Sequence, residues 1–259
     1  METSQEDSNK FIQEALRIIN LAQSQNVIMR LMGGFAIRLH SPKFDYLYDR
    51  LQRKPALDLD IITYSRFRPQ IKKLFVELGY APMKGMALMF DTGRNRQIYT
   101  DEANNRSVDV FFDKLEMCHV IDFKNRLELD SPTITLSDLL LQKAQICKIN
   151  EKDIKDMIIL LREHNVGDME KETINIRYAA KLLSDNWGFW YTVKMNLTKV
   201  QEFLNQYEAL TDADRQDIKS KIGKLLKSIE DEPKSLSWKI RAKIGTKKRW
   251  YTEVEELVR

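Results

Sequence analysis

The sequence has few of the features that would place it in a membrane or crosslink it. No apolar run approaches the roughly 20 residues that a transmembrane helix needs, and the polar N-terminus METSQEDSNK is unlike a secretory signal peptide. Cys118 and Cys147 are the only cysteines. Two cysteines are too few for a disulfide framework or a zinc cage, and their apolar neighbours favour reduced, buried thiols. We therefore expect a cytoplasmic protein with no membrane association.

Over most of the chain, neither positive nor negative charge is in large excess. The formal net charge is +4, but from Arg215 onward there are 13 Lys/Arg against 7 Asp/Glu, so the excess positive charge lies in the C-terminal part. A basic segment of this kind permits binding to a polyanion such as RNA. Solvated helix faces would explain the same segment without a partner, so both interpretations stay open.

The first half of the chain alternates between helical and strand patterns. With 43% hydrophobic and 31% charged residues, its 259 residues are enough for one large domain or two small ones. Apolar spacing and terminal Pro and Gly predict helices, while alternation and β-branched residues predict strands. The expected helices cover residues 9–23 and 68–80, and the expected strands cover 57–63, 86–91, 96–100, 107–112, 118–123 and 132–136.

After Ser137 the sequence changes to helical periodicity, with Ser137, Thr173 and Thr211 as expected N-caps. We therefore predict the α+β class: a mixed or antiparallel sheet with flanking helices over residues 1–136, followed by an all-helical domain over 137–259. The expected C-terminal helices cover residues 137–149, 151–164, 173–185, 187–207 and 212–229.

Three aspartates on two predicted strands form the strongest chemical pattern. In ALDLDIIT, Asp58 and Asp60 are two positions apart and share one face of a strand, and Asp109 occupies the equivalent kind of position in SVDVFFD. If the two strands are neighbours, the three carboxylates gather, and such a cluster is costly unless a cation neutralises it. Magnesium prefers oxygen ligands and shares phosphate oxygens, so a pair of Mg²⁺ ions is the expected cofactor.

Only nine glycines occur in the chain, and Gly33 and Gly34 stand together in LMGGFAIRL. A glycine pair that opens a helix lets backbone N–H groups approach a phosphate closely. Glycines for phosphates and aspartates for cations together predict a nucleoside triphosphate (NTP) site. Each motif also has a plainer interpretation: a tight turn for the glycines, and exposed surface carboxylates for the aspartates.

The order of these motifs resembles the nucleotidyltransferase superfamily with the DNA-polymerase-β-like catalytic fold. That family has a Gly-Gly or Gly-Ser turn, then Asp-x-Asp on one strand and a third Asp on a later strand. Here they match Gly33 and Gly34, Asp58 and Asp60, and Asp109. The stretch VDVFFDKLEMCHVIDF also looks like a group of uncharacterised bacterial nucleotidyltransferase-family proteins. The resemblance departs from many active members at Phe35, where they have a small residue.

A second part of the resemblance concerns the helices that follow. Lys143, with Asp153 and Asp156 at the start of the next helix, matches the abortive-infection toxin branch of the superfamily, so the likeness covers roughly residues 10–165. A segment of 15 residues, 40–54, lengthens the spacing between the glycines and Asp58. This insertion would either shape an acceptor site or extend a loop.

The resemblance implies roles for the matched strand residues. Asp58 and Asp60 would hold the magnesium that accompanies the nucleotide, and Asp109 would hold the second ion. Gly33 and Gly34 would bind the triphosphate through their backbone.

For the helical residues, the resemblance implies nucleotide-binding roles beside structural alternatives. Lys143 would reach a triphosphate oxygen as a catalytic residue, or would face solvent. Arg38 would contact a phosphate or only the following loop. Asp153 and Asp156 would bind with the nucleotide or stabilise the helix N-terminus.

The predicted function is therefore Mg²⁺-dependent transfer of a nucleoside monophosphate (NMP) from an NTP to an acceptor hydroxyl. The acceptor would be an RNA or tRNA end, a protein or a small molecule, and a toxin-like role, as in a toxin–antitoxin pair, is one version. The alternative is an inactive nucleotide- or RNA-binding module of the same fold. The sequence leaves the nucleotide, the acceptor and the oligomeric state open.

The aromatic stretch WGFWYTVKM, residues 187–195, has two interpretations. It can form a platform for a base, or it can pack between helices. The histidines His40, His119 and His164 lack metal-ligand spacing, so we expect them to be ordinary buried or surface residues.

Overall fold

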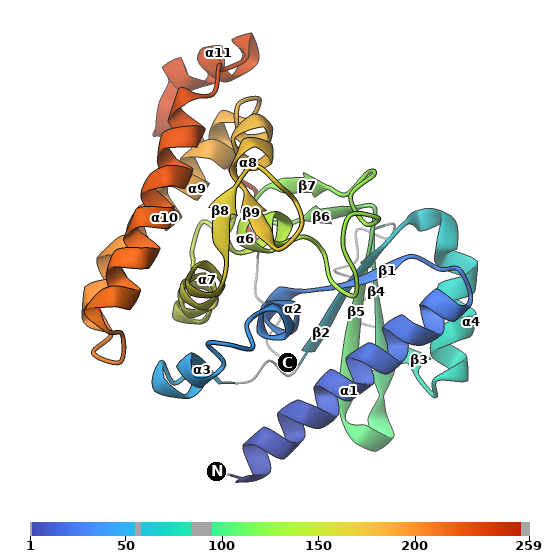
Figure 1. Cartoon of the computed structure of the whole chain (residues 1–259). Helices are drawn as coiled ribbons and strands as arrows, with labels where there is room; N and C mark the ends of the chain where they lie inside the picture. Colours follow the sequence, from blue (N-terminus) through green and yellow to red (C-terminus); the bar gives the residue numbers. More distant parts are fainter. Residues whose placement is uncertain (1, 55–57, 84–94, 255–259) are drawn as a thin grey trace. The chain divides into compact units, whose positions relative to one another are not determined.

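The computed structural model describes residues 2–54, 58–83 and 95–254, without the side chains of residues 2–10 and 58 (Figure 1). The predicted strand 86–91 lies outside the described residues. Backbone contacts divide the chain into two compact units. The first comprises Met1–Ala36, Pro55–Leu115 and Ile121–Thr135, and the second comprises Ile37–Lys54, Glu116–Val120 and Leu136–Arg259. The predicted domains 1–136 and 137–259 stay a prediction.

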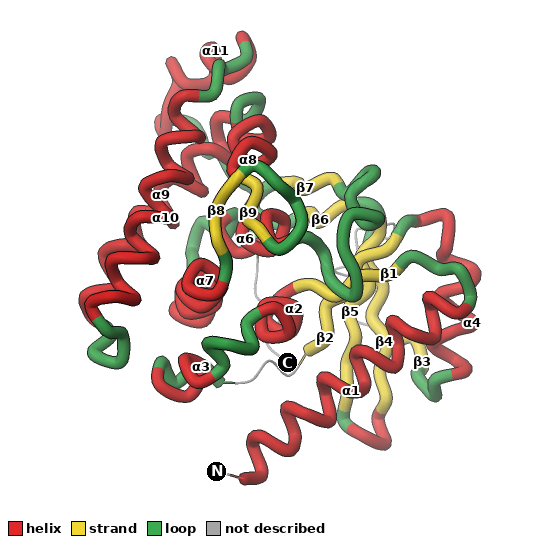
Figure 2. The backbone as a smooth tube through the Cα atoms, viewed as in Figure 1, coloured by secondary structure: helices red, strands yellow, loops and turns green. Residues whose placement is uncertain are grey.

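The first unit is built on a five-stranded mixed sheet (Figure 2). The strand order is β1-β2-β5-β4-β3, in which β2 and β5 run parallel and the other neighbours run antiparallel. The central parallel pair is therefore the part of the sheet that carries the two predicted aspartate strands. The strands are β1 (Met29–Met32), β2 (Asp58–Thr63), β3 (Ala81–Pro82), β4 (Arg96–Asp101) and β5 (Arg106–Phe112).

Two helices of the first unit, α1 (Glu2–Ser24) and α4 (Arg68–Glu77), pack side by side against the sheet (Figure 1). The ring of Phe75 on α4 stacks on Tyr99 of β4, with 4.1 Å between the ring centroids. Tyr99 is paired with Val108 of β5, which is paired with Leu59 of β2. Paired residues share a face of the sheet, so Leu59 faces this helical layer, where it is fully buried. The aspartates, one position away, belong to the opposite face of the sheet.

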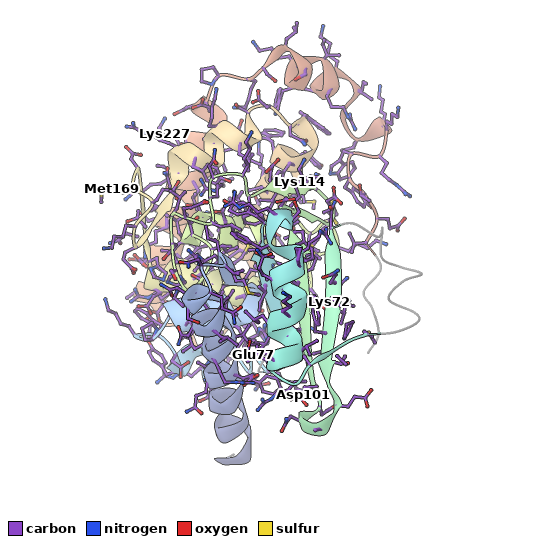
Figure 3. The ribbon with its side chains drawn as sticks, turned by 90° about the vertical axis from the view of Figure 1, so that its right-hand side faces the viewer. Lys72, Glu77, Asp101, Lys114, Met169 and Lys227 are labelled. Atoms are coloured by element: carbon purple, nitrogen blue, oxygen red, sulfur yellow. The ribbon has the colours of Figure 1, made fainter. Side chains whose placement is uncertain are left out.

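Helix α4 begins at Arg68, as the sequence predicts, and ends at Glu77, three residues before the predicted bound. Pro69 stands in its first turn, and Gly79 follows its last turn with φ +87°. Lys72 and Glu77 are exposed along its outer side, as Figure 3 shows. Its apolar residues Ile71, Leu74 and Phe75 are buried.

The second unit is mainly helical (Figure 2). Helix α10 packs against α7, α8 and α9, and α6 packs against α7 and α9. Strands β8 and β9 add a small two-stranded parallel sheet. The elements are α3 (Tyr46–Arg50), α6 (Leu136–Ala144), α7 (Glu151–Glu163), β8 (Asn165–Gly167), β9 (Thr173–Asn175), α8 (Ile176–Leu183), α9 (Trp187–Phe203), α10 (Asp212–Asp231) and α11 (Leu236–Ile244).

Three elements contain positions at which the chain passes from one unit to the other, and short 3₁₀ turns occur elsewhere. The helix α2 (Gly33–His40) starts in the first unit and ends in the second, and β6 (Lys114–Glu116) with β7 (Val120–Asp122) forms a two-stranded sheet where the chain passes between them. Short 3₁₀ turns occur at Ser65–Phe67, Glu102–Asn104, Leu204–Gln206 and Gly245–Lys247.

The predicted α+β class is confirmed by this mixed sheet, its flanking helices and the helical C-terminal region, to which β8 and β9 add two strands. No helix among the described residues combines the length and apolar character needed to cross a bilayer. Residues 132–136 form an isolated bridge between Thr133 and Leu31 rather than the predicted strand.

The predicted N-caps have mixed outcomes. Thr211 caps α10 in a full capping box with Asp214, as predicted. The prediction for Thr173 is wrong, because it lies in β9 and Asn175 caps α8 through a bond from the Tyr178 amide. Ser137 is also not a cap, because α6 already begins at Leu136.

Candidate functional site

The first of the paired glycines lies directly against one of the predicted metal ligands. Strand β1 ends at Met32 and α2 begins at Gly33, whose φ is +74°. A Cβ atom at this position would lie 2.5 Å from Oδ2 of Asp60. Both the backbone conformation and the space therefore require glycine. The antiparallel pairing of Met32 with Asp60 creates this approach.

Asp60 and Asp109 are direct neighbours in the sheet. They are Cα partners on the parallel strands β2 and β5. Side chains of paired residues lie on the same face of a sheet, so the two aspartates share the face opposite to Leu59 and Val108, which are fully buried. The prediction that the carboxylates gather depended on these two strands being neighbours, and β2 and β5 are paired.

Asp58 is the first residue of β2 and is paired with Ser107. Its side chain lies outside what the structure describes. Among the side chains that are described, no three His, Cys, Asp or Glu residues form a group that could hold a metal ion. The convergence of all three aspartates therefore stays a prediction.

Asp109 has a partner that the sequence did not predict. Nη2 of Arg96, on β4, lies 2.5 Å from Oδ2 of Asp109, whose side chain is 5% exposed. The Arg96 guanidinium also covers the ring of Phe111, at 5.2 Å from its centroid. Within the part of the chain that the structure describes, Nε of Arg96 is buried without a hydrogen-bond partner. A buried carboxylate is thus neutralised by a cation whose own donors are incompletely used.

Phe35, the departure from the family pattern, belongs to the hydrophobic core. It is 4% exposed, and its ring centroid lies 5.9 Å from that of Phe11 on α1. The ring therefore contributes to helix packing in the first unit. A small residue here would remove that packing.

Lys143, Asp153 and Asp156 form a charged cluster in the second unit. Nζ of Lys143 lies 2.7 Å from Oδ1 of Asp153 and 3.0 Å from Oδ2 of Asp156. Arg53 adds a bidentate pair to Asp156, with N···O distances of 2.7 and 2.9 Å. The three residues matched to the toxin branch are therefore in contact with one another, and Arg53 is a further member of the cluster that sequence reasoning missed.

The charges in this cluster stabilise one another. Burial alone would lower the pKa of Lys143, but the carboxylates of Asp156 and Asp153 outweigh burial and raise it above its ordinary value. Burial alone would raise the pKa of Asp156, but Lys143 and Arg53 lower it. Lys143 and Asp156 are therefore both ionised near neutral pH. Asp153 also has its amide capped by the Asn150 side chain at the start of α7.

Arg38 binds the loop that follows its helix. Its guanidinium donates to Asp45, with 3.0 Å between Nε and Oδ1, and lies 5.0 Å from the centroid of the Tyr48 ring. These contacts tie α2 to the segment around α3 within the second unit. The predicted contact between Arg38 and a phosphate stays a prediction.

The aromatic stretch on α9 packs against the C-terminal residues. The Trp187 and Tyr191 rings stack at 5.2 Å, and the Trp190 ring meets Trp238 of α11 edge-on at 5.0 Å. Gly188 allows a further close approach, because a Cβ there would lie 2.4 Å from the carbonyl oxygen of Trp250. Helix packing thus accounts for these rings.

Comparisons with known proteins find distant likeness. No protein-family model matches the chain, and no curated protein matches it. The antibiotic-resistance factor ANT(2'')-Ia, solved in solution, is similar over 68% of this chain and 95% of its own, with 12% identity and a TM-score of 0.40. An antigenic nucleotidyltransferase-like protein from Paracoccidioides brasiliensis is similar over 90% of this chain and 95% of its own, with 13% identity and a TM-score of 0.41. Scores this low decide neither fold nor activity.

Proposed function

We propose that this chain is a nucleotidyltransferase that transfers NMP from an NTP to an acceptor hydroxyl, with Mg²⁺ as its cofactor. The observation that carries the proposal is the in-register pairing of Asp60 and Asp109 on adjacent parallel strands. Gly33, which opens α2 against the Asp60 carboxylate, brings a helix N-terminus to the same place. Carboxylates for cations and a helix N-terminus for a phosphate are the two elements that an NTP site needs.

The donor chemistry at this site suits magnesium. Asp60 and Asp109, together with Asp58 by the sequence pattern, offer the carboxylate oxygens that this hard cation prefers. A buried carboxylate is stable only beside a positive charge, which Arg96 supplies to Asp109 here and which a bound cation would also supply. When bound, the metal neutralises phosphate charge and lowers the pKa of an acceptor hydroxyl.

The residues of the chain contribute position and charge. The sheet holds Asp60 and Asp109 on one face, and the N-terminus of α2 at Gly33 and Gly34 would receive a phosphate through its backbone N–H groups. Arg96 balances the charge of Asp109 until another cation replaces it. Catalysis of this kind depends mainly on orientation and charge neutralisation.

Lys143 is proposed to act with the charged cluster of the second unit. Because it is paired with Asp153 and Asp156, its role toward a nucleotide would require an exchange of one of these partners. Asp153 and Asp156 are then positioning residues for the lysine.

The acceptor is proposed as an RNA or tRNA end, a protein or a small molecule. Resemblance to the toxin branch favours a toxin-like role, in which modification of an essential cellular molecule would arrest growth. Mg²⁺, ATP or another NTP and a cytoplasmic setting belong to the same proposal.

One observation favours the alternative of an inactive binding module. The ion pair between Arg96 and Asp109 neutralises the charge of a predicted metal ligand with a residue of the same chain. Such a pair would be expected in a protein of this fold that no longer binds a metal. The burial of Phe35 against Phe11 supports the enzyme instead, because it keeps the ring out of the glycine turn.

Radiolabelled NMP transfer tests the proposal. The purified protein is incubated with each NTP labelled at the α-phosphorus, Mg²⁺, and either bulk cellular RNA or protein. An Asp58→Ala/Asp60→Ala double variant runs alongside, and nucleotide binding by both proteins is measured by equilibrium dialysis. Asp168→Ala, on a half-exposed carboxylate of the second unit that pairs only at the surface with Arg177, is the matched control.

We expect label to reach an acceptor with the wild type and the Asp168→Ala control and not with the double variant. Absence of transfer to any acceptor, combined with NTP binding that the double variant retains, would support the inactive module. Transfer that survives in the double variant would place the chemistry elsewhere.

A further inference from the structure

Helix α11 exposes a row of large aliphatic side chains. Leu236, Ile240 and Ile244 are 74%, 56% and 40% exposed. Residues four apart lie above one another on a helix, so the three form one stripe along α11 (Leu236–Ile244). Single exposed apolar residues are common, but an aligned row of them marks an interaction surface.

The opposite side of α11 is firmly attached to the protein. Trp238 meets the Trp190 ring edge-on, and the Arg241 guanidinium lies 4.8 Å from the centroid of the Trp187 ring. The start of the helix is fixed by the Ser235 amide, which donates to the Ser184 carbonyl at 3.1 Å. The stripe is therefore exposed on an anchored helix and is not the result of a detached segment.

The charges on the chain segment that carries the stripe have one sign. Residues 233–252 contain seven Lys/Arg and no Asp/Glu. Lys239 and Lys243 are both exposed, and each lies three positions after a stripe residue, which places it beside the stripe. The surface thus combines an apolar row with a flanking row of lysines.

We propose that this surface of α11 docks an acidic amphipathic helix of a partner protein. Aliphatic side chains of the partner would cover Leu236, Ile240 and Ile244, and its carboxylates would pair with Lys239 and Lys243. Such helix-on-helix recognition uses apolar anchors at helical spacing, while the complementary charges fix partner and orientation.

Other occupants fit the surface less well. A second copy of the chain meeting α11 with α11 would bring lysine rows together, and a nine-residue helix about 13 Å long is too short for the roughly 800 Å² per partner of a stable dimer. RNA phosphates would pair with the lysines but would leave the aliphatic stripe in water.

Fluorescence anisotropy with a designed peptide tests the proposal. The probe is a labelled helical peptide that has Leu on one face and Glu beside it, and the comparison probe has the same composition in scrambled order. The test variants of the full chain are Leu236→Ser/Ile240→Ser and Lys239→Gln/Lys243→Gln. The matched controls are Val76→Ser and Lys72→Gln, since Val76 is 59% exposed and Lys72 is exposed on α4.

The amphipathic peptide is expected to bind saturably, and each α11 variant is expected to weaken binding by about tenfold or more, with the controls unchanged. Circular dichroism should show that all variants stay folded, because the altered side chains are exposed. Four results would overturn the proposal: equal binding of the scrambled peptide, no saturable binding, α11-dependent binding of single-stranded RNA or of phosphatidylserine vesicles in place of the peptide, or self-association that the serine variant abolishes.

Discussion

At Gly33 the fold and the candidate chemistry depend on the same contact. The residue has a left-handed φ of +74°, and Oδ2 of Asp60 occupies the space that a Cβ would need. The sequence suggested that the glycine pair exists so that backbone can meet a phosphate. The structure adds a second reason, because the glycine leaves room for a predicted metal ligand.

Gly33→Ala should therefore destabilise the protein more than the same substitution at a glycine that has a positive φ but no atom near the position of an added Cβ. Gly79 is that control, since its φ is +87° and an added Cβ would meet nothing within 4 Å. We expect Gly79→Ala to lower the free energy of unfolding by about 1 kcal/mol, and Gly33→Ala to lower it by a further ~1 kcal/mol or more. Urea denaturation measures both.

The extra cost at Gly33 should depend on Asp60. In an Asp60→Ala background the added methyl no longer meets a carboxylate, so the two glycine variants should become similar. An unchanged difference in that background would show that the strain has another source.

Arg96 and a metal ion would compete for Asp109. Arg96→Gln replaces the guanidinium by a neutral amide and should therefore tighten Mn²⁺ binding. We expect an effect of about tenfold, because the charge removed lies within hydrogen-bonding distance of the carboxylate that would bind the metal. Electron paramagnetic resonance of free Mn²⁺ gives the affinity without any need for turnover. Arg66→Gln, on an arginine whose side chain is 62% exposed, controls for net charge. Weaker or unchanged Mn²⁺ binding in Arg96→Gln would contradict the competition.

At the level of the elements, the insertion between α2 and β2 is held against helix α7. Arg53 at its end pairs with the fully buried Asp156 of α7, and the Phe44 amide donates to Glu163 of the same helix at 3.1 Å. The segment thus belongs to the second unit through its charges. A role in shaping an acceptor site stays a prediction.

Arg53→Ala should destabilise the protein strongly, because it leaves part of the charge on a fully buried Asp156 uncompensated. Removing one partner of a buried ion pair costs about 3–5 kcal/mol. The matched control is Arg177→Ala, whose partner Asp168 lies at the surface and whose own side chain is 77% exposed. That change should stay within about 0.5 kcal/mol. Chemical denaturation of both variants decides the point, and equal losses would contradict the account.

The sequence predicted those elements whose signals are local. Alternation identified β2 and β5, Pro69 and Gly79 bounded α4, and the Thr211 capping box started α10. Strand β1 was missed because its four residues, MRLM, do not alternate, and three of them are buried. The two residues of β3 are too few for any pattern.

The sequence predicted the motifs of the candidate site but not the arginines that pair with its aspartates. The sequence placed Asp60 and Asp109 together only on the condition that their strands are neighbours, which the structure meets, whereas Arg96 and Arg53 become visible only through three-dimensional contacts. Arg53 and its partner Asp156 are separated by 103 positions. No sequence spacing could indicate such a pair. The register of β4 on β5, which brings Arg96 near Asp109, is likewise a tertiary property.

At the scale of the whole molecule, two buried histidines should make stability depend on pH. Burial lowers the pKa of His119 to about 4, and burial together with nearby His40 lowers the pKa of His164 to about 4. An unfolded histidine titrates near pH 6.5. Between these values the unfolded chain binds more protons than the folded one, so stability falls as pH falls.

Each histidine contributes at most about 1.4 kcal/mol per pH unit in that window. Urea denaturation at about pH 7 and about pH 5 should therefore show a loss of stability that shrinks in His119→Gln and in His164→Gln. Carboxylates with lowered pKa values, such as Asp156, lose their contribution only at more acidic pH. A pH dependence that neither variant reduces would contradict burial of neutral imidazoles as its cause.

In the proposed function, Asp60 and Asp109 hold a metal ion together with a nucleotide. The most direct measurement is an anomalous difference map from crystals grown with Mn²⁺ and a non-hydrolysable NTP analogue. We expect a manganese peak in contact with the carboxylates of Asp60 and Asp109, and Arg96 displaced from Asp109. A nucleotide bound without a peak there, with the Arg96–Asp109 pair intact, would contradict it.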